Sequence, residues 1–316
     1  MKLLKLVPDH TNLDFMRWRN LALALSLIAT VVSISYTVYK GLNLGIDFIG
    51  GEVVRAEFAR PVHIDELRTK VEQLGVGEAS IQALGNDRTY QIRLPKPTGA
   101  ETASNAMVSK LRTAIPQEYA GARVDAGESV SGKVSEELAR DSSIAIALAM
   151  IGIAIYIWFR FEWQFGVGAL LTLAHDIAMT LGFFAFTRLP VDLNVVAAFL
   201  TIIGYSLNDT VVIYDRIREN LRKYRKMAIL PLLNLSLNET LARTVVTSLT
   251  VLIALGVLML IGPHVIFGLA IAIFLGVVIG TYSSIYISAP VLVWLGVQPD
   301  SFLKSDEKEA AEAQPA

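Results

Sequence analysis

Residues 191–220, VDLNVVAAFLTIIGYSLNDTVVIYDRIREN, indicate the fold class most clearly. Most of this stretch is apolar and long enough for a membrane helix, yet Asp209 lies deep within the apolar part. A charge near the centre of a bilayer costs about 2.5–3.5 kcal/mol on insertion scales, and such residues almost always face the interior of a helix bundle. We therefore expect a titratable site inside a bundle of membrane helices.

The composition of the whole chain also indicates a membrane protein. The 316 residues are 53% hydrophobic and 18% charged, whereas an ordinary soluble domain is about 25% charged. The net charge of −1 gives no reason to expect a nucleic-acid partner. The chain has no cysteine, which excludes disulfides, cysteine nucleophiles and thiolate metal sites.

Apolar segments long enough to cross a membrane occur repeatedly. A helix needs about 20 apolar residues to span the hydrocarbon core. Six segments meet or approach that length: 20–39, 142–159, 163–187, 193–214, 244–262 and 265–295. The first follows basic residues, as a signal peptide does, but its apolar part is too long and no small-residue cleavage site follows. We expect it to be a retained helix.

The Lys and Arg residues of the short loops predict the orientation in the membrane. Four of them lie in the N-terminal segment 1–19 and six in the loop 215–241, whereas the short loops on the other side contain a single arginine. We therefore expect these two segments and the tail 296–316 to be cytoplasmic. Residues 40–141 are then exported to the periplasm.

The exported segment has the pattern of a small α+β domain. Alternating apolar residues and turn signals predict strands over 51–58, 79–84, 90–94 and 122–130, with helices over 61–74 and 101–114. This β-α-β-β-α-β order is typical of a ferredoxin-like fold. No catalytic constellation is visible in it, so the domain is either a binding or hinge module or a folded spacer.

Polar residues around Asp209 suggest what its carboxylate does. Thr201, Tyr205, Asn208 and Asp209 share a helix face by spacing, and Arg243 stands at the mouth of the next span. An Asp209–Arg243 charge pair would be either a proton-coupled switch or an ion pair that only joins two helices. In a switch, moving the arginine away favours proton uptake and its return favours release.

A second pair of ionisable residues, His175 and Asp176, interrupts the preceding span. Adjacent residues point about 100° apart on a helix. We expect Asp176 to point inward and His175 toward a neighbouring helix, as either a structural pair or a proton relay. Metal-ligand spacing such as HExxH is absent, so neither a metal nor a cofactor is expected.

Glycines mark the exit from the first span. Gly45, Asp47, Gly50 and Gly51 form either a hinge between membrane and exported domain or an ordinary exit turn with a capping aspartate. Gly276 and Gly280 form a GxxxG pattern in the last span, which is typical of close helix packing.

Five motifs together resemble the SecF family of protein-export membrane proteins. They are GLNLGIDFIGG (41–51), LTLAHDIAMTLGFF (171–184), TIIGYSLNDTVVIYDRIREN (201–220), LNETLARTVVTSLT (237–250) and GTYSSIYISAPVLVWL (280–295). The resemblance covers nearly the whole chain in order, and no SecD half is present.

The resemblance implies a six-helix bundle of the resistance-nodulation-division (RND) type in the bacterial inner membrane. It implies work with SecD at the SecYEG channel, where the proton motive force promotes preprotein export after SecA has acted. YajC, YidC and membrane lipid are further partners to expect. The family ties the positions that match the polar stripe of the fourth span to proton passage.

Other functional classes fit the sequence less well. An intramembrane aspartyl protease needs a GxGD motif, a serine hydrolase elbow needs GxSxG and an ATPase needs a P-loop, and none of these is present. A stand-alone proton-coupled transporter of small molecules would contain a second, repeated site. A passive structural subunit of the translocon is the remaining alternative. We expect no enzyme activity.

Overall fold

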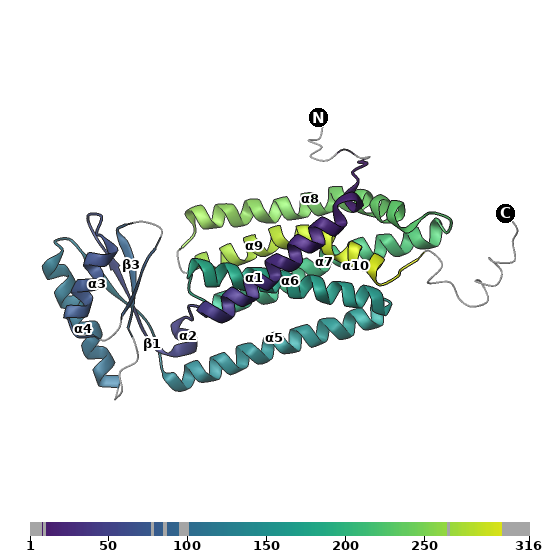
Figure 1. Ribbon diagram of the computed structural model, residues 1–316. Helices are drawn as coiled ribbons and strands as arrows, with labels where there is room; N and C mark the ends of the chain where they lie inside the picture. The colour runs from purple at the N-terminus through teal and green to yellow at the C-terminus, as the bar shows by residue number, and fades with distance from the viewer. Residues whose placement is uncertain are drawn as a thin grey trace, which may run out of the picture.

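The computed structural model describes residues 8, 11–76, 79–84, 87–94, 101–263 and 266–298. A bundle of long helices occupies most of the molecule, and a small α+β domain lies at one end of it (Figure 1). The predicted tail from residue 299 onward, most of segment 1–10 and the predicted turn at 85–86 lie outside the described residues.

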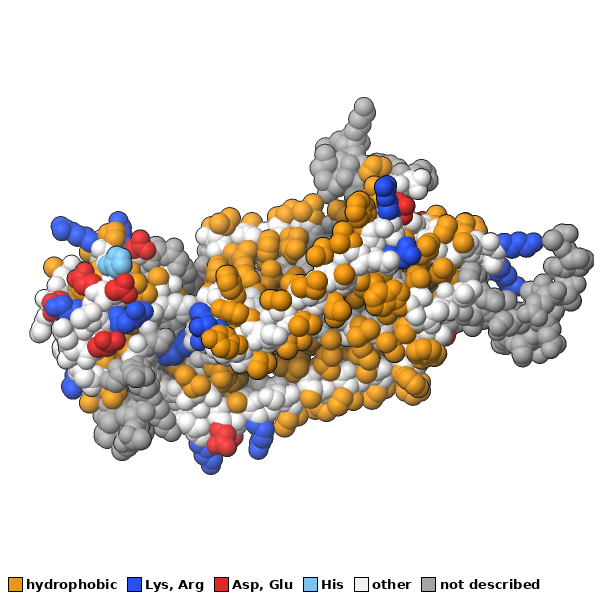
Figure 2. Space-filling model, viewed as in Figure 1, with side chains coloured by type: hydrophobic (Ala, Val, Ile, Leu, Met, Phe, Trp, Pro, Cys, Tyr) orange, Lys and Arg blue, Asp and Glu red, His pale blue; other side chains and the backbone are white. Residues whose placement is uncertain are grey.

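Six helices are long and apolar enough to cross a membrane, as predicted. They are α1 (Arg19–Lys40, after the short 3-10 turn η1, Phe15–Trp18), α5 (Gly132–Arg160), α6 (Trp163–Thr187), α7 (Leu193–Lys223), α8 (Ile229–Ile261) and a composite last helix made of α9 (Phe267–Ser283), the π-helical turn η3 (Ser284–Ser288) and α10 (Ala289–Trp294). Hydrophobic side chains cover the visible face of the bundle, and charged ones gather at its ends and on the small domain (Figure 2).

The basic loop predicted over 215–241 is mostly helical. Helix α7 continues to Lys223 and α8 already begins at Ile229, so residues 224–228 alone connect them. The charges mark the end of the apolar segment but not the end of the helix, because Arg216 is neutralised by Glu219 (2.6 Å) and Glu239 (2.7 Å) on the same two helices. Helix α5 likewise begins at Gly132, ahead of its predicted span. The membrane boundaries remain predictions.

The small domain has the predicted ferredoxin-like order. Its elements are β1 (Gly51–Glu57), α3 (Ile64–Gln73), β2 (Ser80–Ala83), β3 (Thr89–Leu94), α4 (Glu101–Glu118) and β4 (Arg123–Val130). The four strands form an antiparallel sheet in the order β2-β3-β1-β4. Leu67 of α3 and Leu111 of α4 pack with Val54 and Ile92 in one core. Both helices therefore cover one face, and the other face is turned toward the bundle (Figure 1).

Small residues bring the membrane helices into close contact. At Gly276 of α9, an added Cβ would overlap the side chain of Ile202 on α7, and at Gly280 it would lie 3.2 Å from Cβ of Ser206. On α6, Gly182 leaves the space that Ser33 of α1 occupies. The GxxxG pattern thus serves packing between helices of this chain.

We expect Gly276→Ala to lower stability by about 1–3 kcal/mol, the usual cost of overpacking a well-packed core. The buried Ile202 side chain must shift to admit the methyl group. Thermal unfolding in detergent measures the effect. Gly256→Ala on α8 is the matched control, since nothing lies within 4 Å of its Cβ position. Combined with Ile202→Ala, Gly276→Ala should cost less than the sum of the two single substitutions, and additive effects would contradict the explanation.

Candidate proton-coupling site

Asp209 lies inside the bundle on α7 and is unusually short of partners. The residue is only 4% exposed, and its Oδ2 atom is buried without a hydrogen-bond partner. Among the described residues no ion pair reaches it at 4.0 Å or less. A buried carboxylate without hydrogen bonds is costly in its charged form. It is therefore suited to bind a proton.

The residues predicted to share the face of Asp209 divide between interior and surface. Tyr205 is partly buried, and its hydroxyl lies 3.4 Å from the Ser248 hydroxyl of α8, which in turn contacts Thr281 of α9 at 2.8 Å. Asn208 and Thr201 are instead exposed. Successive residues of a helix point about 100° apart, so Asn208 can lie on the exposed face of α7 while the adjacent Asp209 lies on the buried face. The expectation that the whole stripe faces the bundle is wrong for these two.

Arg243 does not form the predicted ion pair with Asp209 in this structure. It is exposed on α8, and within the described part of the chain it takes part in no salt bridge. It is nevertheless close enough to act electrostatically on the Asp209 carboxylate. Polar and charged groups do not stay exposed to lipid without a partner. Asn208 and Arg243 are therefore two exposed polar residues, on α7 and α8, beside the buried Asp209.

Asp176 has the opposite environment and is completely satisfied. Its residue is fully buried, its Oδ1 lies 2.9 Å from Nδ1 of His175, and its Oδ2 accepts hydrogen bonds from Ser206 of α7 (2.5 Å) and Ser283 of α9 (3.0 Å). Asp176 thus points inward, as expected, and joins three helices. His175 is also buried, and its ring lies 6.4 Å from that of Tyr282.

The two acids are connected through α7. Ser206, which binds Asp176, lies three residues before Asp209, and residues at that spacing are neighbours on a helix surface. The sequence reasoning missed Ser206, Ser283 and Tyr282, whose hydroxyl contacts that of Ser26 at 2.9 Å. All three are hydroxyl residues within apolar segments, and this feature of the sequence could have identified them. What the spacing did not reveal is the π-helical turn at Ser284–Ser288, which shifts the phase of the last helix.

The glycine-rich segment after the first span, residues 45–51, is hydrogen-bonded to the start of α7 and to Val191 just before it. Gly45 N–H donates to the Val191 carbonyl (2.7 Å), and Asp47 accepts from Leu193 N–H (2.8 Å) at the start of α7. Gly50 and Gly51 have positive φ values of 71° and 124°, which favour glycine. Asp47 is therefore a capping aspartate, but for a helix distant in sequence. Hinge motion at these glycines remains a prediction.

Comparison with known proteins supplies the family. The model of the family "Protein export membrane protein SecD/SecF, C-terminal" matches residues 112–298. "Protein translocase subunit SecF" of Vibrio alginolyticus is 37% identical over 311 residues, 98% of each chain. That of Rickettsia akari is 40% identical over 291 residues, 92% of this chain and 94% of the relative. This chain belongs to the SecD/SecF family.

Solved structures agree with this assignment to the SecD/SecF family. A crystal structure of SecDF from Thermus, a translocon-associated membrane protein, matches with a TM-score of 0.83 and 34% identity over 92% of this chain. SecDF in a super-membrane-facing form matches with a TM-score of 0.66 and 33% identity over 96%. The chain spans 39–40% of the length of these SecDF chains. It is thus a multi-pass membrane protein with the fold of one part of SecDF.

One near-match to a nucleotide-binding motif does not form such a site here. GESVSGKV, residues 127–134, differs from a P-loop only in its final Val134. The structure places most of it in β4, which continues through Val130, and Ser131 already caps α5. A P-loop needs a glycine-rich loop between strand and helix whose N–H groups cradle phosphate. That loop is missing at this point of the chain.

The contrast between the two acids gives a stability prediction. We expect Asp176→Ala to destabilise the bundle by several kcal/mol, because each buried polar group left without its partner costs about 1–3 kcal/mol. Asp209→Ala should cost far less, since its carboxylate makes no hydrogen bond to lose. Thermal unfolding of the two variants in the same detergent makes the comparison. A larger loss for Asp209→Ala would contradict the assigned hydrogen bonds.

Proposed function

We propose that this chain is the SecF-type subunit of a protein translocase in the bacterial inner membrane and promotes preprotein export by passing protons at Asp209. The observation that supports it best is the buried, unpartnered Asp209 carboxylate on a membrane-spanning helix. A group of this kind changes its charge when its surroundings change slightly. Family membership and the SecDF fold give the protein-export context.

The exposed polar residues beside Asp209 favour a partner rather than a stand-alone transporter. Asn208 lies on the exposed surface of α7 within the predicted fourth span, where lipid offers no hydrogen bonds, and Arg243 is exposed on α8 at the mouth of the predicted fifth span. The part of the solved SecDF chains that matches this chain makes up about two fifths of their length. We infer that a SecD-type subunit covers this surface and completes the proton path.

Arg243 is the second element of the proposed switch. Exposed on α8, as in this structure, it acts on the Asp209 carboxylate from a distance but forms no ion pair with it, and this weaker stabilisation favours proton uptake. Moved inward, it stabilises the carboxylate, and the proton is released. The membrane potential supplies about 2.3 kcal/mol per charge per 100 mV. Asp176, held by three hydrogen bonds, fixes the helices around this exchange.

The orientation follows from the basic residues and the position of the domain. The α7–α8 connection lies at the end of the bundle opposite the small domain (Figure 1). With the Lys- and Arg-rich end in the cytoplasm, residues 40–141 lie in the periplasm. There the domain meets preproteins emerging from SecYEG after SecA has acted. YajC, YidC and membrane lipid are the further contacts that we propose.

We predict that Asp209→Asn abolishes proton-driven stimulation of export while the subunit still assembles with its SecD-type partner. The amide keeps the shape of the side chain but cannot carry the charge. The measurement is export of a secreted preprotein by cells in which this subunit replaces the resident one, with copurification to follow assembly. Glu219→Gln, an exposed acid on the same helix, is the matched control. Export at the parental rate by Asp209→Asn would contradict the proposed proton-coupling role and favour a passive structural subunit.

Arg243 variants test the counter-charge separately. We expect Arg243→Ala to lose export and Arg243→Lys to retain part of it, because lysine keeps the charge but not the planar fork that grips a carboxylate. Stability should change little in both variants, since the side chain is exposed. The same export assay with a thermal-unfolding control separates the two effects. Full export by Arg243→Ala would rule out the Asp209–Arg243 switch.

A further inference from the structure

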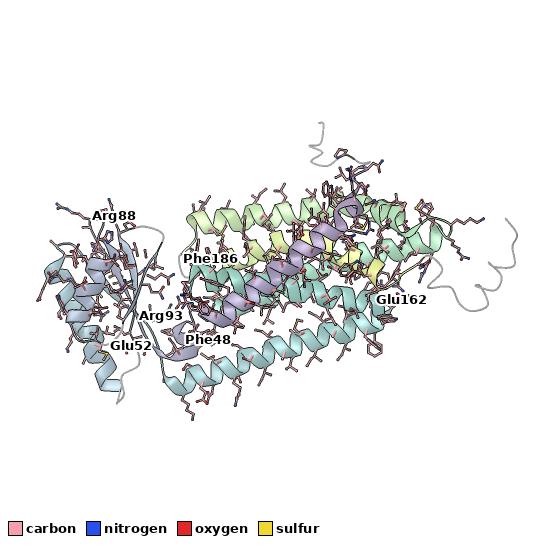
Figure 3. All side chains as sticks on the ribbon, in the orientation of Figure 1. Phe48, Glu52, Arg88, Arg93, Glu162 and Phe186 are labelled. Atoms are coloured by element: carbon pink, nitrogen blue, oxygen red, sulfur yellow. The ribbon has the colours of Figure 1, made fainter. Side chains whose placement is uncertain are left out.

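A buried arginine joins the exported domain to the membrane bundle. Arg93 lies near the end of β3, next to Ile92 and Leu94 of the domain core, and therefore on the opposite face of the sheet. It is only 7% exposed, which is rare for a charged residue. In Figure 3 it lies between the sheet and the bundle, near Phe48 of the segment that follows α1.

The partners of Arg93 belong to the segment between the first span and the domain. Its Nη1 donates to Oδ1 of Asn43 (3.1 Å) and to the carbonyl oxygen of Leu44 (2.9 Å). Its Nε is buried without a partner. The domain is thus attached to this segment through its sheet as well as through the covalent chain.

The same segment is bonded to the start of α7. Leu44 pairs with Val191 as an isolated parallel bridge, and Val191 N–H donates to the Asn43 carbonyl (2.8 Å). Asp47 accepts the N–H of Leu193 (2.8 Å), and Asp192 accepts that of Val195 (2.9 Å). Backbone N–H groups of the first turn of α7 are therefore held partly by the linker.

Charge strengthens the connection between Arg93 and α7. Burial lowers the pKa of Arg93 from its ordinary value, and the nearby carboxylates of Asp192 and Asp47 oppose that change. Arginine is a permanent cation in proteins, and its charge attracts both residues that cap α7. The Arg93 guanidinium thus binds the linker through hydrogen bonds and also interacts electrostatically with Asp47 and Asp192 at the start of α7.

We propose that Arg93 is an interdomain latch that fixes the orientation of the exported domain to the N-terminal end of α7. Helix α7 is continuous from Leu193 to Lys223, so a displacement near Asp209 moves its first turn as well. Through Asp47, Asn43 and Arg93 that displacement reaches the sheet. The transmission of proton-driven movement rests on the proposed function, whereas the latch itself does not.

The latch is tested by hydrogen exchange on the full chain, copurified with its SecD-type partner in lipid nanodiscs without a proton gradient. We expect Arg93→Ala to raise exchange in residues 42–48 and in the first turn of α7 about ten- to a hundredfold, as expected for lost hydrogen bonds to a charged group. Strands β1 and β3 should stay protected. Arg93→Lys should give an intermediate increase, because lysine keeps the charge without the fork. Arg123→Ala, an exposed arginine of the same sheet, is the control and should change neither segment.

Two outcomes would overturn the latch. One is unchanged exchange at the start of α7 in Arg93→Ala. The other is a general rise across β1 and β3, which would make Arg93 a residue for folding the domain and not for positioning it. Asn43→Ala removes one acceptor from the linker side and should raise exchange in the same two segments. Combined with Arg93→Ala it should add little, since interacting residues are not additive.

The export assay separates this inference from the proposed function. Arg93→Ala should lower the rate of export, whereas Asp209 should still bind and release its proton. If Asp209→Asn exports normally, the proposed function fails, but the exchange result for Arg93 stands. If Arg93→Ala shows the expected exchange but exports at the parental rate, the latch positions the domain and does not transmit movement.

Discussion

The lipid interior offers no hydrogen-bond partner, so every polar group within the bundle has to find one inside the protein. Most hydroxyl side chains meet this constraint by donating to the carbonyl four residues earlier, as Thr30, Thr172, Thr180 and Ser236 do. The Asp176 carboxylate meets it through bonds to three neighbours from α6, α7 and α9. Those bonds, together with the close approach at Gly280, set how the three helices pack.

Asp209 is one of the few described residues that do not meet this constraint. Its Oδ2 has no partner, and the threonine hydroxyls of Thr210 and Thr244 are also buried without one. Buried polar groups are nearly always hydrogen-bonded, so each exception calls for an explanation. The proposed proton-binding role accounts for the unpaired oxygen of Asp209. The two acids thus have different environments on neighbouring helices, and Ser206, which binds Asp176, lies one turn before Asp209 on α7.

Much of the fold could be predicted because it depends on local patterns. Apolar length indicated the six spans, and alternation with turn residues indicated the order of the ferredoxin-like domain. The extent of α7 and α8 could not be predicted in this way. Arg216 was counted as a loop charge, although its pairing with Glu239 on the next helix lets both helices continue beyond the apolar part.

The candidate site was predicted only in part, for a related reason. Periodicity identified Asp209, Asp176 and Arg243, but periodicity does not say which side of a helix is covered by a partner. Asn208 and Thr201 were therefore expected inside, and the structure has them exposed. The contact between Asp47 and Leu193 joins residues far apart in the chain, and no local pattern announces it.

Difference infrared spectroscopy of the purified complex can show which buried acid binds the proton. It detects the carbonyl band of a protonated carboxyl group and follows its loss as the pH rises. If Asp209 is the proton-binding acid, we expect one titrating band that disappears in Asp209→Asn and persists in Asp176→Asn. A band that persists in Asp209→Asn, or that disappears only in Asp176→Asn, would contradict it.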